Sequence, residues 1–328
     1  MSLIDPFQRS INYLRISVTD RCDFRCVYCM NEEMTFLPRS QLLTLEELAE
    51  IATAFSEMGV KKIRITGGEP LVRRNVLSLF NELGQLPGLD ELTLTTNGSQ
   101  LTHYAQELRR AGVKRINISL DSLRVDRFRE LTRVGDLNKV LAGIQAAKAA
   151  HFDNIKLNSV ILKNRNADEV VDLVRFALDN QLDISFIEEM PLGAVTDHIR
   201  REEFCSSQEL RDMLGATFEL SAVEDNTGGP SRYWRVNDSQ TRVGFISPHS
   251  ENFCASCNRV RLTAEGRLLL CLGNEHSADL KAVVRRHPGD RDKLKEVIVE
   301  AIKIKPERHY FTHDDEPQIV RLMNTTGG

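Results

Sequence analysis

Short runs rich in β-branched residues alternate with helical patterns along the first two thirds of the chain. We predict strands over 13–19, 62–66, 91–96, 115–120, 155–162 and 183–188, and helices over 44–58, 138–150 and 168–179. The helix over 44–58 is the clearest, because Thr44 and Glu47 form a capping box and Gly59 ends the apolar periodicity. Strands that alternate with helices predict an α/β fold with a parallel sheet and right-handed crossovers. Six such units predict a partial (β/α)6 TIM-like barrel.

The pattern changes from about Ser221 onward. The glycine-rich run NTGGPSRYW begins a region with two short predicted strands, over 233–236 and 242–247, and a last helix is predicted over 291–304. This region is too small and too rich in loops to form a separate α/β domain. We therefore expect a barrel domain over residues 1–220 and a C-terminal domain over 221–328 that covers the open side of the barrel.

Polar and glycine-rich segments follow the predicted strands, where parallel barrels carry their active sites. These segments are Thr19 with Asp20, the run TGGEP at 66–70, the run TTNGS at 95–99, Ser119 with Asp121, and 188–190, and Lys156 with Asn158 lies just after the start of the fifth strand. Because the carboxyl ends of parallel strands meet at one end of a barrel, we expect these residues to share one mouth.

Composition limits the class of protein. The 328 residues carry a net charge of −4 and a pI near 6.1, so no general basic field favours nucleic acid. No apolar run approaches the roughly 20 residues that a bilayer requires, and the N-terminal residues lack the apolar core of a signal peptide. We expect a cytoplasmic protein that binds neither nucleic acid nor a membrane.

Seven cysteines in a reducing compartment indicate metal ligation rather than disulfides. They comprise a first triad of Cys22, Cys26 and Cys29, a second triad of Cys254, Cys257 and Cys271, and a free thiol at Cys205. Three thiolates bind three irons of a cubane cluster and leave the fourth iron free for a substrate or cofactor. Arg21 and Arg25 lie beside the first triad, and we expect their positive charge to favour the thiolate form. A C-terminal domain that covers the barrel would bring both triads to one cavity.

The second triad leaves two interpretations. A structural zinc site would need a fourth ligand, such as His249 or His276. The run CNRVR favours another ligand, because Arg259 and Arg261 lie two residues apart and share one face of an extended segment. Two guanidinium groups beside an iron with a free position suit an anion that carries a heterocycle, as a nucleotide does.

The first triad, with its C-x3-C-x2-C spacing and Tyr28 before the last cysteine, resembles that of the radical S-adenosylmethionine enzymes. The run TGGEP supports the resemblance, because paired glycines at a strand end allow close backbone approach and positive φ. The resemblance covers the whole chain and is strongest to members that act on GTP in molybdenum cofactor biosynthesis. It implies a 4Fe–4S cluster on each triad and S-adenosylmethionine on the first cluster. The S-adenosylmethionine ligands that it implies are Tyr28, Gly67, Gly68, Glu69, Ser119 and Met190.

The resemblance also implies a substrate site and a reaction. The implied GTP ligands are Arg15, Arg64, Thr95, Lys156, Arg259 and Arg261, and the implied catalytic residues are Arg15 with Gly327 and Gly328 of a tail that enters the site. From composition alone, the ending NTTGG predicts a flexible tail. The implied activity is that of a lyase: a 5′-deoxyadenosyl radical removes hydrogen from C3′ of GTP, and C3′ attacks C8.

The partners that the resemblance implies are a flavodoxin- or ferredoxin-type electron donor, the next enzyme of the pathway (cyclic pyranopterin monophosphate synthase) and a second copy of the chain in a homodimer. Two alternatives stay open. One is a radical enzyme with an auxiliary cluster that modifies a peptide or RNA, and more cysteine groups in the C-terminal domain would favour it. The other is a non-catalytic iron–sulfur or zinc protein that carries electrons or regulates, and zinc content without iron would favour it.

Overall fold

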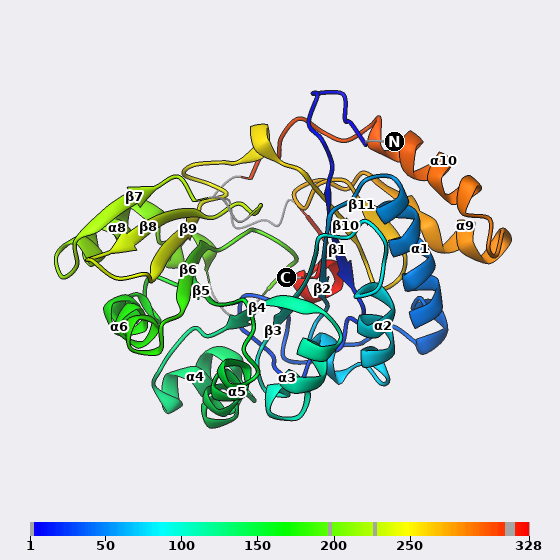
Figure 1. Cartoon of the computed structure of the whole chain (residues 1–328). Helices are drawn as coiled ribbons and strands as arrows, with labels where there is room; N and C mark the ends of the chain where they lie inside the picture. The colour runs from blue at the N-terminus through cyan, green and yellow to red at the C-terminus, as the bar shows by residue number, and fades with distance from the viewer. Residues whose placement is uncertain (1–2, 196–198, 226–227, 312–318, 328) are drawn as a thin grey trace.

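The computed structural model describes residues 3–195, 199–225, 228–311 and 319–327. Its centre is one twelve-stranded sheet in the order β12-β11-β10-β1-β2-β3-β4-β5-β6-β9-β8-β7. The middle of the sheet is formed by β1 (Tyr13–Ser17), β2 (Lys62–Thr66), β3 (Glu91–Thr96), β4 (Val113–Ser119), β5 (Asn154–Ile161) and β6 (Asp183–Glu188), all parallel. Figure 1 shows this sheet curving around the centre of the molecule, with helices on the outside. The predicted partial barrel is confirmed, and it stays open between the edge strands β12 and β7.

The helices between the strands cover the outer face of the sheet. They are α1 (Leu45–Glu57), α2 (Val76–Leu83), α3 (Leu101–Arg110), α4 (Val125–Thr132), α5 (Leu137–Ala149) and α6 (Val170–Asn180). The capping box predicted at Thr44 and Glu47 is present at the start of α1. Apolar strand residues such as Leu14 and Ile63 are fully buried against these helices and form the core. None of the described helices is long and apolar enough to cross a membrane.

The C-terminal strands extend the sheet at both of its edges. The first group, β7 (Leu220–Val223), β8 (Arg232–Val236) and β9 (Arg242–Ile246), continues from β6, and β9 runs parallel to β6. The second group, β10 (Arg259–Leu262), β11 (Arg267–Leu269) and β12 (Ser277–Asp279), continues from β1, and β10 runs parallel to β1. The chain between β9 and β10 therefore crosses the open side of the barrel. The domain boundary near residue 220 stays a prediction.

Four shorter helices and one long one complete this part of the chain. They are α7 (Arg200–Glu203), α8 (Ser207–Gly215), α9 (Leu280–Arg286), α10 (Arg291–Ile302) and α11 (Met323–Thr326). Ion pairs from α9 and α10 to α1, Arg285 to Glu47 at 2.7 Å and Arg291 to Glu57 at 2.5 Å, fasten the C-terminal helices to the barrel. The helix α11 lies inside the barrel beside β1 and β2, as Figure 1 shows in red.

Candidate active site

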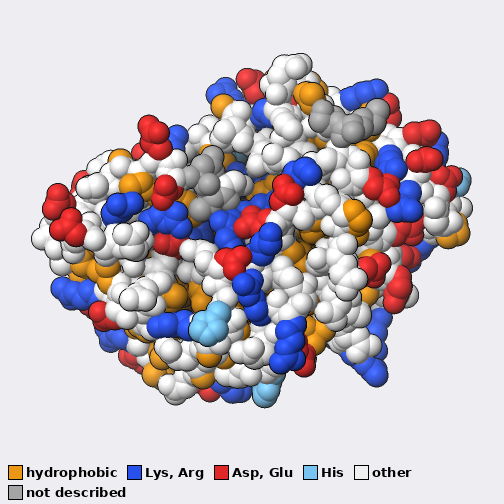
Figure 2. Space-filling view, viewed as in Figure 1, with side chains coloured by type: hydrophobic (Ala, Val, Ile, Leu, Met, Phe, Trp, Pro, Cys, Tyr) orange, Lys and Arg blue, Asp and Glu red, His pale blue; other side chains and the backbone are white. Residues whose placement is uncertain are grey.

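Alternate residues of the barrel strands face one central cavity. Those on the first five strands are Tyr13, Arg15, Lys62, Arg64, Thr66, Thr95, Arg115, Asn117, Ser119, Asn154, Lys156, Asn158 and Val160, and Thr96 at the end of β3 also lines the cavity. Successive side chains of a strand point to opposite faces, so the apolar residues between them pack against the helices instead. Figure 2 shows Lys and Arg side chains gathered around the central hollow. A polar, cationic wall of this kind suits an anionic ligand.

Both triads line this cavity, at opposite ends of the strands. The first triad follows the carboxyl end of β1. Cys257 lies two residues before β10, which is parallel to β1, and Cys271 lies two residues after β11, which is antiparallel to β10. Both therefore lie at the amino end of the barrel strands. Because the five residues of β1 span about 16 Å, the triads are separated by roughly the length of a strand. The expectation of one shared cavity is confirmed.

The first triad lies among buried carboxylates. Burial, followed by the charge of Glu69, raises the pKa of Cys22 above its usual range. Burial and the charge of Asp121 raise the pKa of Cys26 in the same direction, and burial raises the pKa of Cys29 to about 12. In the protein without metal, these three thiols are therefore protonated at neutral pH.

The prediction that Arg21 and Arg25 would favour the thiolate form of the first triad is wrong. The Arg25 guanidinium donates to the carbonyl oxygens of Cys22 at 2.7 Å and Phe24 at 2.8 Å. It also lies 5.0 Å from the ring of Phe36, and the Arg21 guanidinium lies 5.7 Å from the same ring. Arg25 holds the backbone of the loop and Arg21 lies against Phe36, whereas burial and carboxylates decide the pKa of the sulfurs.

The two glycines of TGGEP bring the end of β2 against the loop of the first triad. A Cβ atom on Gly67 would lie 2.8 Å from the Thr19 carbonyl oxygen, and one on Gly68 would lie 2.3 Å from the Arg21 carbonyl oxygen. Neither glycine has a positive φ, so that part of the expectation is wrong. Their requirement is close packing, and the result is a backbone cradle beside Cys22 that a larger residue would fill.

Glu69, the residue after Gly68, fixes the backbone around this cradle. Its carboxylate is fully buried and accepts hydrogen bonds from the Asn97 amide at 2.6 Å, the Leu71 amide at 3.0 Å and the Thr96 hydroxyl at 2.8 Å. Burial raises the pKa of Glu69 to about 8, although these hydrogen bonds act in the opposite direction. The end of the cavity that holds the first triad thus carries a carboxyl group that titrates near neutrality.

Tyr28 is held by the second buried carboxylate at this end. Its hydroxyl donates to Asp121 Oδ2 at 2.7 Å, and the Val160 amide donates to Asp121 Oδ1 at 2.9 Å. Burial raises the pKa of Asp121 to about 6. Ser119 and Met190 line the same cavity, so the structure brings together all the residues predicted to contact S-adenosylmethionine apart from Glu69, which lies behind the cavity wall.

The second triad lies among cations. The Nδ1 atom of His309 lies 3.1 Å from Cys254 Sγ, and the Lys305 ammonium lies 3.8 Å from Cys257 Sγ. Burial raises the pKa of both thiols, but the hydrogen bond from His309 brings that of Cys254 below its ordinary value. The charges of Lys305 and Arg259 outweigh burial at Cys257 and lower its pKa to about 7.

The fourth ligands proposed for a zinc site do not line the cavity that holds the second triad. Neither His249 nor His276 is among the described residues of its wall, and His276 is exposed. The histidine that contacts the second triad is His309, which the sequence analysis did not select. Among the described residues, no three His, Cys, Asp or Glu side chains converge closely enough to hold a single metal ion. Three thiols spread around a cavity end fit a larger group with several metal atoms, as a cubane cluster has.

Three arginines lie side by side across the sheet between the triads. In the strand register, Arg15 of β1 is paired with Arg261 on one side and Arg64 on the other. Arg64 donates to the Tyr13 hydroxyl at 2.7 Å and to the Thr95 hydroxyl at 3.2 Å. Burial, followed by charge repulsion between the arginines, lowers the pKa of Arg15 to about 10 and that of Arg261 well below its usual range. An anionic ligand would relieve this repulsion.

The cavity also contains functional candidates that sequence reasoning missed. Lys62 and Arg115 both line it, and Glu91 pairs with Lys62 at 2.8 Å and with Arg115. Tyr13 has its pKa lowered to about 6, because the charges of Arg64, Arg15 and Lys62 outweigh its burial. The polar residues at every second position of KIRIT could have indicated Lys62. Such alternation makes one face of the strand polar, and a polar face inside a barrel suits a polar ligand.

Lys156 extends this cationic wall to β5. It is buried in the cavity wall and its Nζ atom donates to the Tyr233 hydroxyl at 3.2 Å. Burial lowers the pKa of Lys156. Every residue predicted to contact GTP therefore lines the same cavity as the two triads.

The composition of the C-terminal tail predicted flexibility, and this prediction is wrong. The described part of the tail is docked inside the barrel. Asn324 and Thr326 are buried, and the Asn324 side chain donates to the Asp20 carbonyl oxygen at 2.9 Å. The Arg261 guanidinium donates to the Gly327 carbonyl oxygen. Gly327 has φ of 78°, and a Cβ atom there would lie 2.2 Å from Thr66 Oγ1, so only glycine fits. The other predicted tail residue, Gly328, lies outside the described residues.

Family models match most of the chain. Residues 16–177 match the Radical SAM superfamily, and residues 182–311 match Molybdenum Cofactor Synthesis C. Two solved structures with low sequence identity share the fold. Streptococcus suis SuiB has a TM-score of 0.62 at 16% identity, over 88% of this chain and 67% of its own. A structure of the same protein bound to S-adenosylmethionine has a TM-score of 0.59 at 16% identity, over 93% of this chain and 75% of its own.

Relatives at much higher identity span the full length. The GTP 3′,8-cyclase of Pseudomonas entomophila is 61% identical over 100% of this chain and 98% of its own. The GTP 3′,8-cyclase of Saccharophagus degradans is 59% identical over 100% of this chain and 99% of its own. With this similarity, and with two cysteine triads at the ends of one cationic barrel cavity, the chain belongs to the GTP 3′,8-cyclase family of radical S-adenosylmethionine enzymes.

Proposed function

We propose that this protein converts GTP into (8S)-3′,8-cyclo-7,8-dihydroguanosine 5′-triphosphate, the lyase reaction that begins molybdenum cofactor biosynthesis. The observation that carries the proposal is the single cavity that joins a cysteine triad among carboxylates to a cysteine triad among cations. Full-length relatives that carry the name GTP 3′,8-cyclase support it.

The first triad and its surroundings form the S-adenosylmethionine site in this proposal. With a 4Fe–4S cluster bound, this site would supply a 5′-deoxyadenosyl radical, which would take a hydrogen atom from C3′ of GTP so that C3′ bonds to C8. The base radical left by this bond would take up one electron, which comes ultimately from the electron donor, and one proton to give the 7,8-dihydro product. The cradle at Gly67 and Gly68 receives the methionine end of the cofactor, while Tyr28, Ser119 and Met190 contact the rest. The carboxylate of Asp121, and that of Glu69 when it is ionised, favour a ligand that carries a positive charge, as S-adenosylmethionine does at its sulfonium.

The cationic wall holds the triphosphate. Guanidinium groups bind phosphate oxygens through two parallel hydrogen bonds, so the row of Arg261, Arg15 and Arg64 fixes orientation as well as charge. Lys156 contributes a compact charge from the facing wall, and Thr95 contributes a hydroxyl. Holding the ribose in one position relative to the radical source can supply about 7–11 kcal/mol in well-oriented systems.

The second triad and the tail complete the site. The second cluster would hold the guanine ring through its open iron, next to Arg259. The tail brings Gly327 to Arg261, and we assign Gly327, Gly328 and Arg15 a direct part in the reaction. A docked tail and the chain that crosses the open side of the barrel also exclude water and stray hydrogen donors, which would otherwise quench radical intermediates.

The remaining partners are also proposals. An electron donor of the flavodoxin or ferredoxin type would reduce the first cluster, and cyclic pyranopterin monophosphate synthase would take the product. A homodimer and a cytoplasmic location are expected from the resemblance and from the cysteine content, respectively.

The test is an anaerobic assay. After cluster reconstitution and addition of dithionite and S-adenosylmethionine, 5′-deoxyadenosine is quantified with GTP, with ATP and with no nucleotide. We expect strong stimulation by GTP alone, with a matching loss of GTP. Equal amounts in all three would keep the radical chemistry but reject GTP as the substrate, as a peptide- or RNA-modifying enzyme requires. No 5′-deoxyadenosine despite full iron loading would favour a non-catalytic iron–sulfur protein.

A further inference from the structure

Lys305 is a buried lysine that points its ammonium at the second triad. It lies three residues beyond the end of α10, and its side chain is buried with the residue 2% exposed. Its Nζ atom lies 2.5 Å from the Leu270 carbonyl oxygen, 3.3 Å from the Arg259 carbonyl oxygen and 3.8 Å from Cys257 Sγ. An ammonium has three N–H donors, and these three acceptors match them.

The acceptors belong to the framework of the second triad. Leu270 immediately precedes Cys271, and Arg259 is the first residue of β10, two residues after Cys257. Lys305 therefore connects the segments that carry two of the three cysteines. Among the contacts that the structure describes, no other side chain is hydrogen-bonded to both the Arg259 and the Leu270 carbonyl oxygens.

The contacts of the Lys305 ammonium in the described part of the chain are two carbonyl oxygens and the Cys257 sulfur, and none of them is a carboxylate. Burying an unpaired charge is costly, so a buried lysine is expected to face an anion. Three thiolates that bind metal make the second triad anionic, and they lie where the ammonium points. The thiolates of the second triad therefore supply the negative charge that faces the Lys305 ammonium once a metal cluster is bound.

We propose that Lys305 is a positioning residue for the second cluster, which holds Cys257 and Cys271 in place and raises the reduction potential of the cluster they bind. This inference rests on the proposed function, in which the second triad binds a 4Fe–4S cluster. A nearby positive charge and a hydrogen bond to a ligating sulfur stabilise the reduced, more negative state of an iron–sulfur cluster. Lys305 has the geometry for both.

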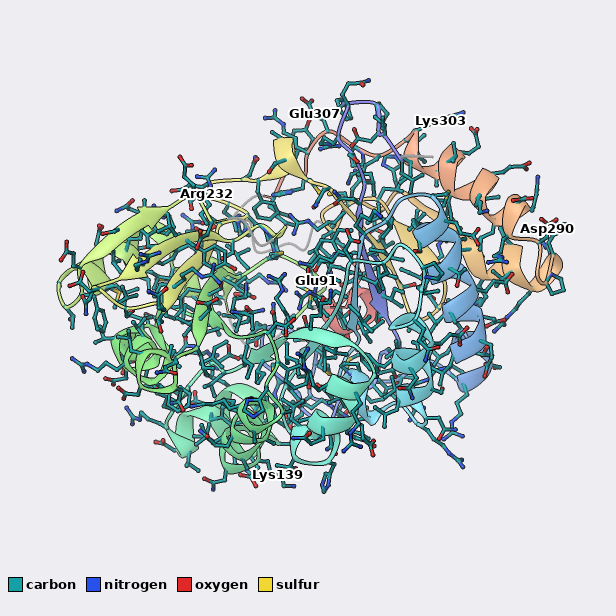
Figure 3. The ribbon with its side chains drawn as sticks, in the orientation of Figure 1. Glu91, Lys139, Arg232, Asp290, Lys303 and Glu307 are labelled. Carbon is teal, nitrogen blue, oxygen red and sulfur yellow. The ribbon has the colours of Figure 1, made fainter. Side chains whose placement is uncertain are left out.

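A matched control lies two residues away. Lys303 is at the end of the same helix, its side chain is 62% exposed, and it pairs with Glu300 at 2.6 Å. Figure 3 shows Lys303 on the outside of the molecule. Removing its charge changes the net charge of the protein by the same amount without changing the surroundings of the triad.

The experiment isolates the second cluster. In the full chain with Cys22→Ala, Cys26→Ala and Cys29→Ala, the cluster of the second triad is reconstituted and titrated by redox-monitored electron paramagnetic resonance. We expect Lys305→Met to lower its midpoint potential, Lys305→Arg to restore most of the shift, and Lys303→Met to leave the potential unchanged. An unchanged potential in a Lys305→Met protein that holds its cluster would overturn the proposal.

Iron content per chain provides the second measurement. If Lys305→Met loses the cluster, Lys305→Gln is titrated instead, and a lowered potential supports the proposal whereas an unchanged one overturns it. If Lys305→Gln also loses the cluster, retention by Lys305→Arg supports the role of the charge, and loss in Lys305→Arg contradicts it. Absence of any cluster with Lys305 intact would instead contradict the proposed function.

Discussion

Each triad consists of three cysteine thiols, yet the side chains around the two triads carry opposite charge. Beside the first triad, burial raises the pKa of each thiol, Asp121 acts in the same direction on Cys26, and Glu69 does so on Cys22 once its own carboxyl group is ionised. Beside the second triad, Lys305 and His309 act against burial, and the pKa values of Cys254 and Cys257 are lowered. Equal ligand sets have thus been placed in two different electrostatic fields.

The difference indicates which ligand each end of the cavity favours. A field that opposes thiolates also opposes anions, so the end at the first triad suits a ligand with positive charge. A field that stabilises thiolates suits anions, so the end at the second triad suits the phosphates and the electron-rich base of a nucleotide. One barrel thereby holds two ligands of unlike charge in a fixed order along its axis.

The largest expected effect comes from removing one cysteine at each end. We expect Cys26→Ala to abolish 5′-deoxyadenosine formation, since the first cluster loses a ligand. We expect Cys257→Ala to keep radical formation from S-adenosylmethionine but to lose GTP cyclisation by roughly 1,000-fold or more, about 4 kcal/mol in transition-state stabilisation. Product analysis by chromatography measures both activities. Normal cyclised product from Cys257→Ala would remove the second cluster from the substrate site.

The thiol chemistry of the metal-free protein tests the comparison directly. Because the thiolate is the reactive form, Cys257, with its pKa of about 7, should react with iodoacetamide at pH 7 at least roughly 100-fold faster than Cys29, with its pKa of about 12. Both are partly buried, so access is similar. Mass spectrometry of peptides over time gives the two rates. Similar rates at the two triads would show that the opposite fields do not exist in solution.

The arginine row should account for much of the nucleotide affinity. We expect Arg261→Ala to weaken GTP binding by roughly 10- to 100-fold, as the loss of a charged hydrogen bond costs about 1.5–3 kcal/mol. S-adenosylmethionine affinity and the iron content of both clusters should stay unchanged. Equilibrium dialysis under anaerobic conditions measures each ligand, and Lys139→Ala on the outer helix α5 is the control (Figure 3). Loss of iron in Arg261→Ala would make Arg261 a structural residue instead.

The barrel was predictable because its information is local. Each strand of the barrel carries its own apolar face, and α1 carries a capping box and a stop, so these elements could be located one at a time, whereas the shorter helices α2, α3 and α4 were not predicted. The strands β11 and β12 were not predicted, because three residues each are too few to show a period of two. Their place at the edge of the sheet depends on pairing with β10, which no local pattern encodes.

The site was predictable where its residues form a motif and not where only folding brings them together. The cysteine spacing and the pair Arg259 and Arg261 could be recognised in a few residues. Lys305 and His309 lie more than 30 residues beyond Cys271 and reach the second triad through tertiary contacts alone. The charge beside the first triad was wrongly predicted for the same reason, since Arg25 is adjacent in sequence but directs its side chain at backbone carbonyls.

The acidic end should make the stability of the metal-free protein depend on pH. Burial raises the folded-state pKa of Glu69 to about 8, above its ordinary value of 4.5, so the folded protein holds this proton more tightly than the unfolded chain. The stability from that proton is complete below pH 4.5 and is lost as the pH rises to 8, with a slope of at most about 1.4 kcal/mol per pH unit. Glu69→Gln should remove this slope.

Thermal unfolding between pH 5 and pH 8 measures how the stability of the parent protein and of Glu69→Gln changes with pH. Glutamine cannot accept all the hydrogen bonds that Glu69 receives from Asn97, Leu71 and Thr96, so its absolute stability will be lower, and the slopes are the quantity to compare. Glu307→Gln removes an exposed carboxylate on the outside of the molecule and should leave the slope of the parent protein unchanged (Figure 3). Parallel slopes for the parent and Glu69→Gln would mean that Glu69 is ionised when folded. The first triad would then lie in a stronger negative field at neutral pH, and the contrast between the two ends of the cavity would be larger.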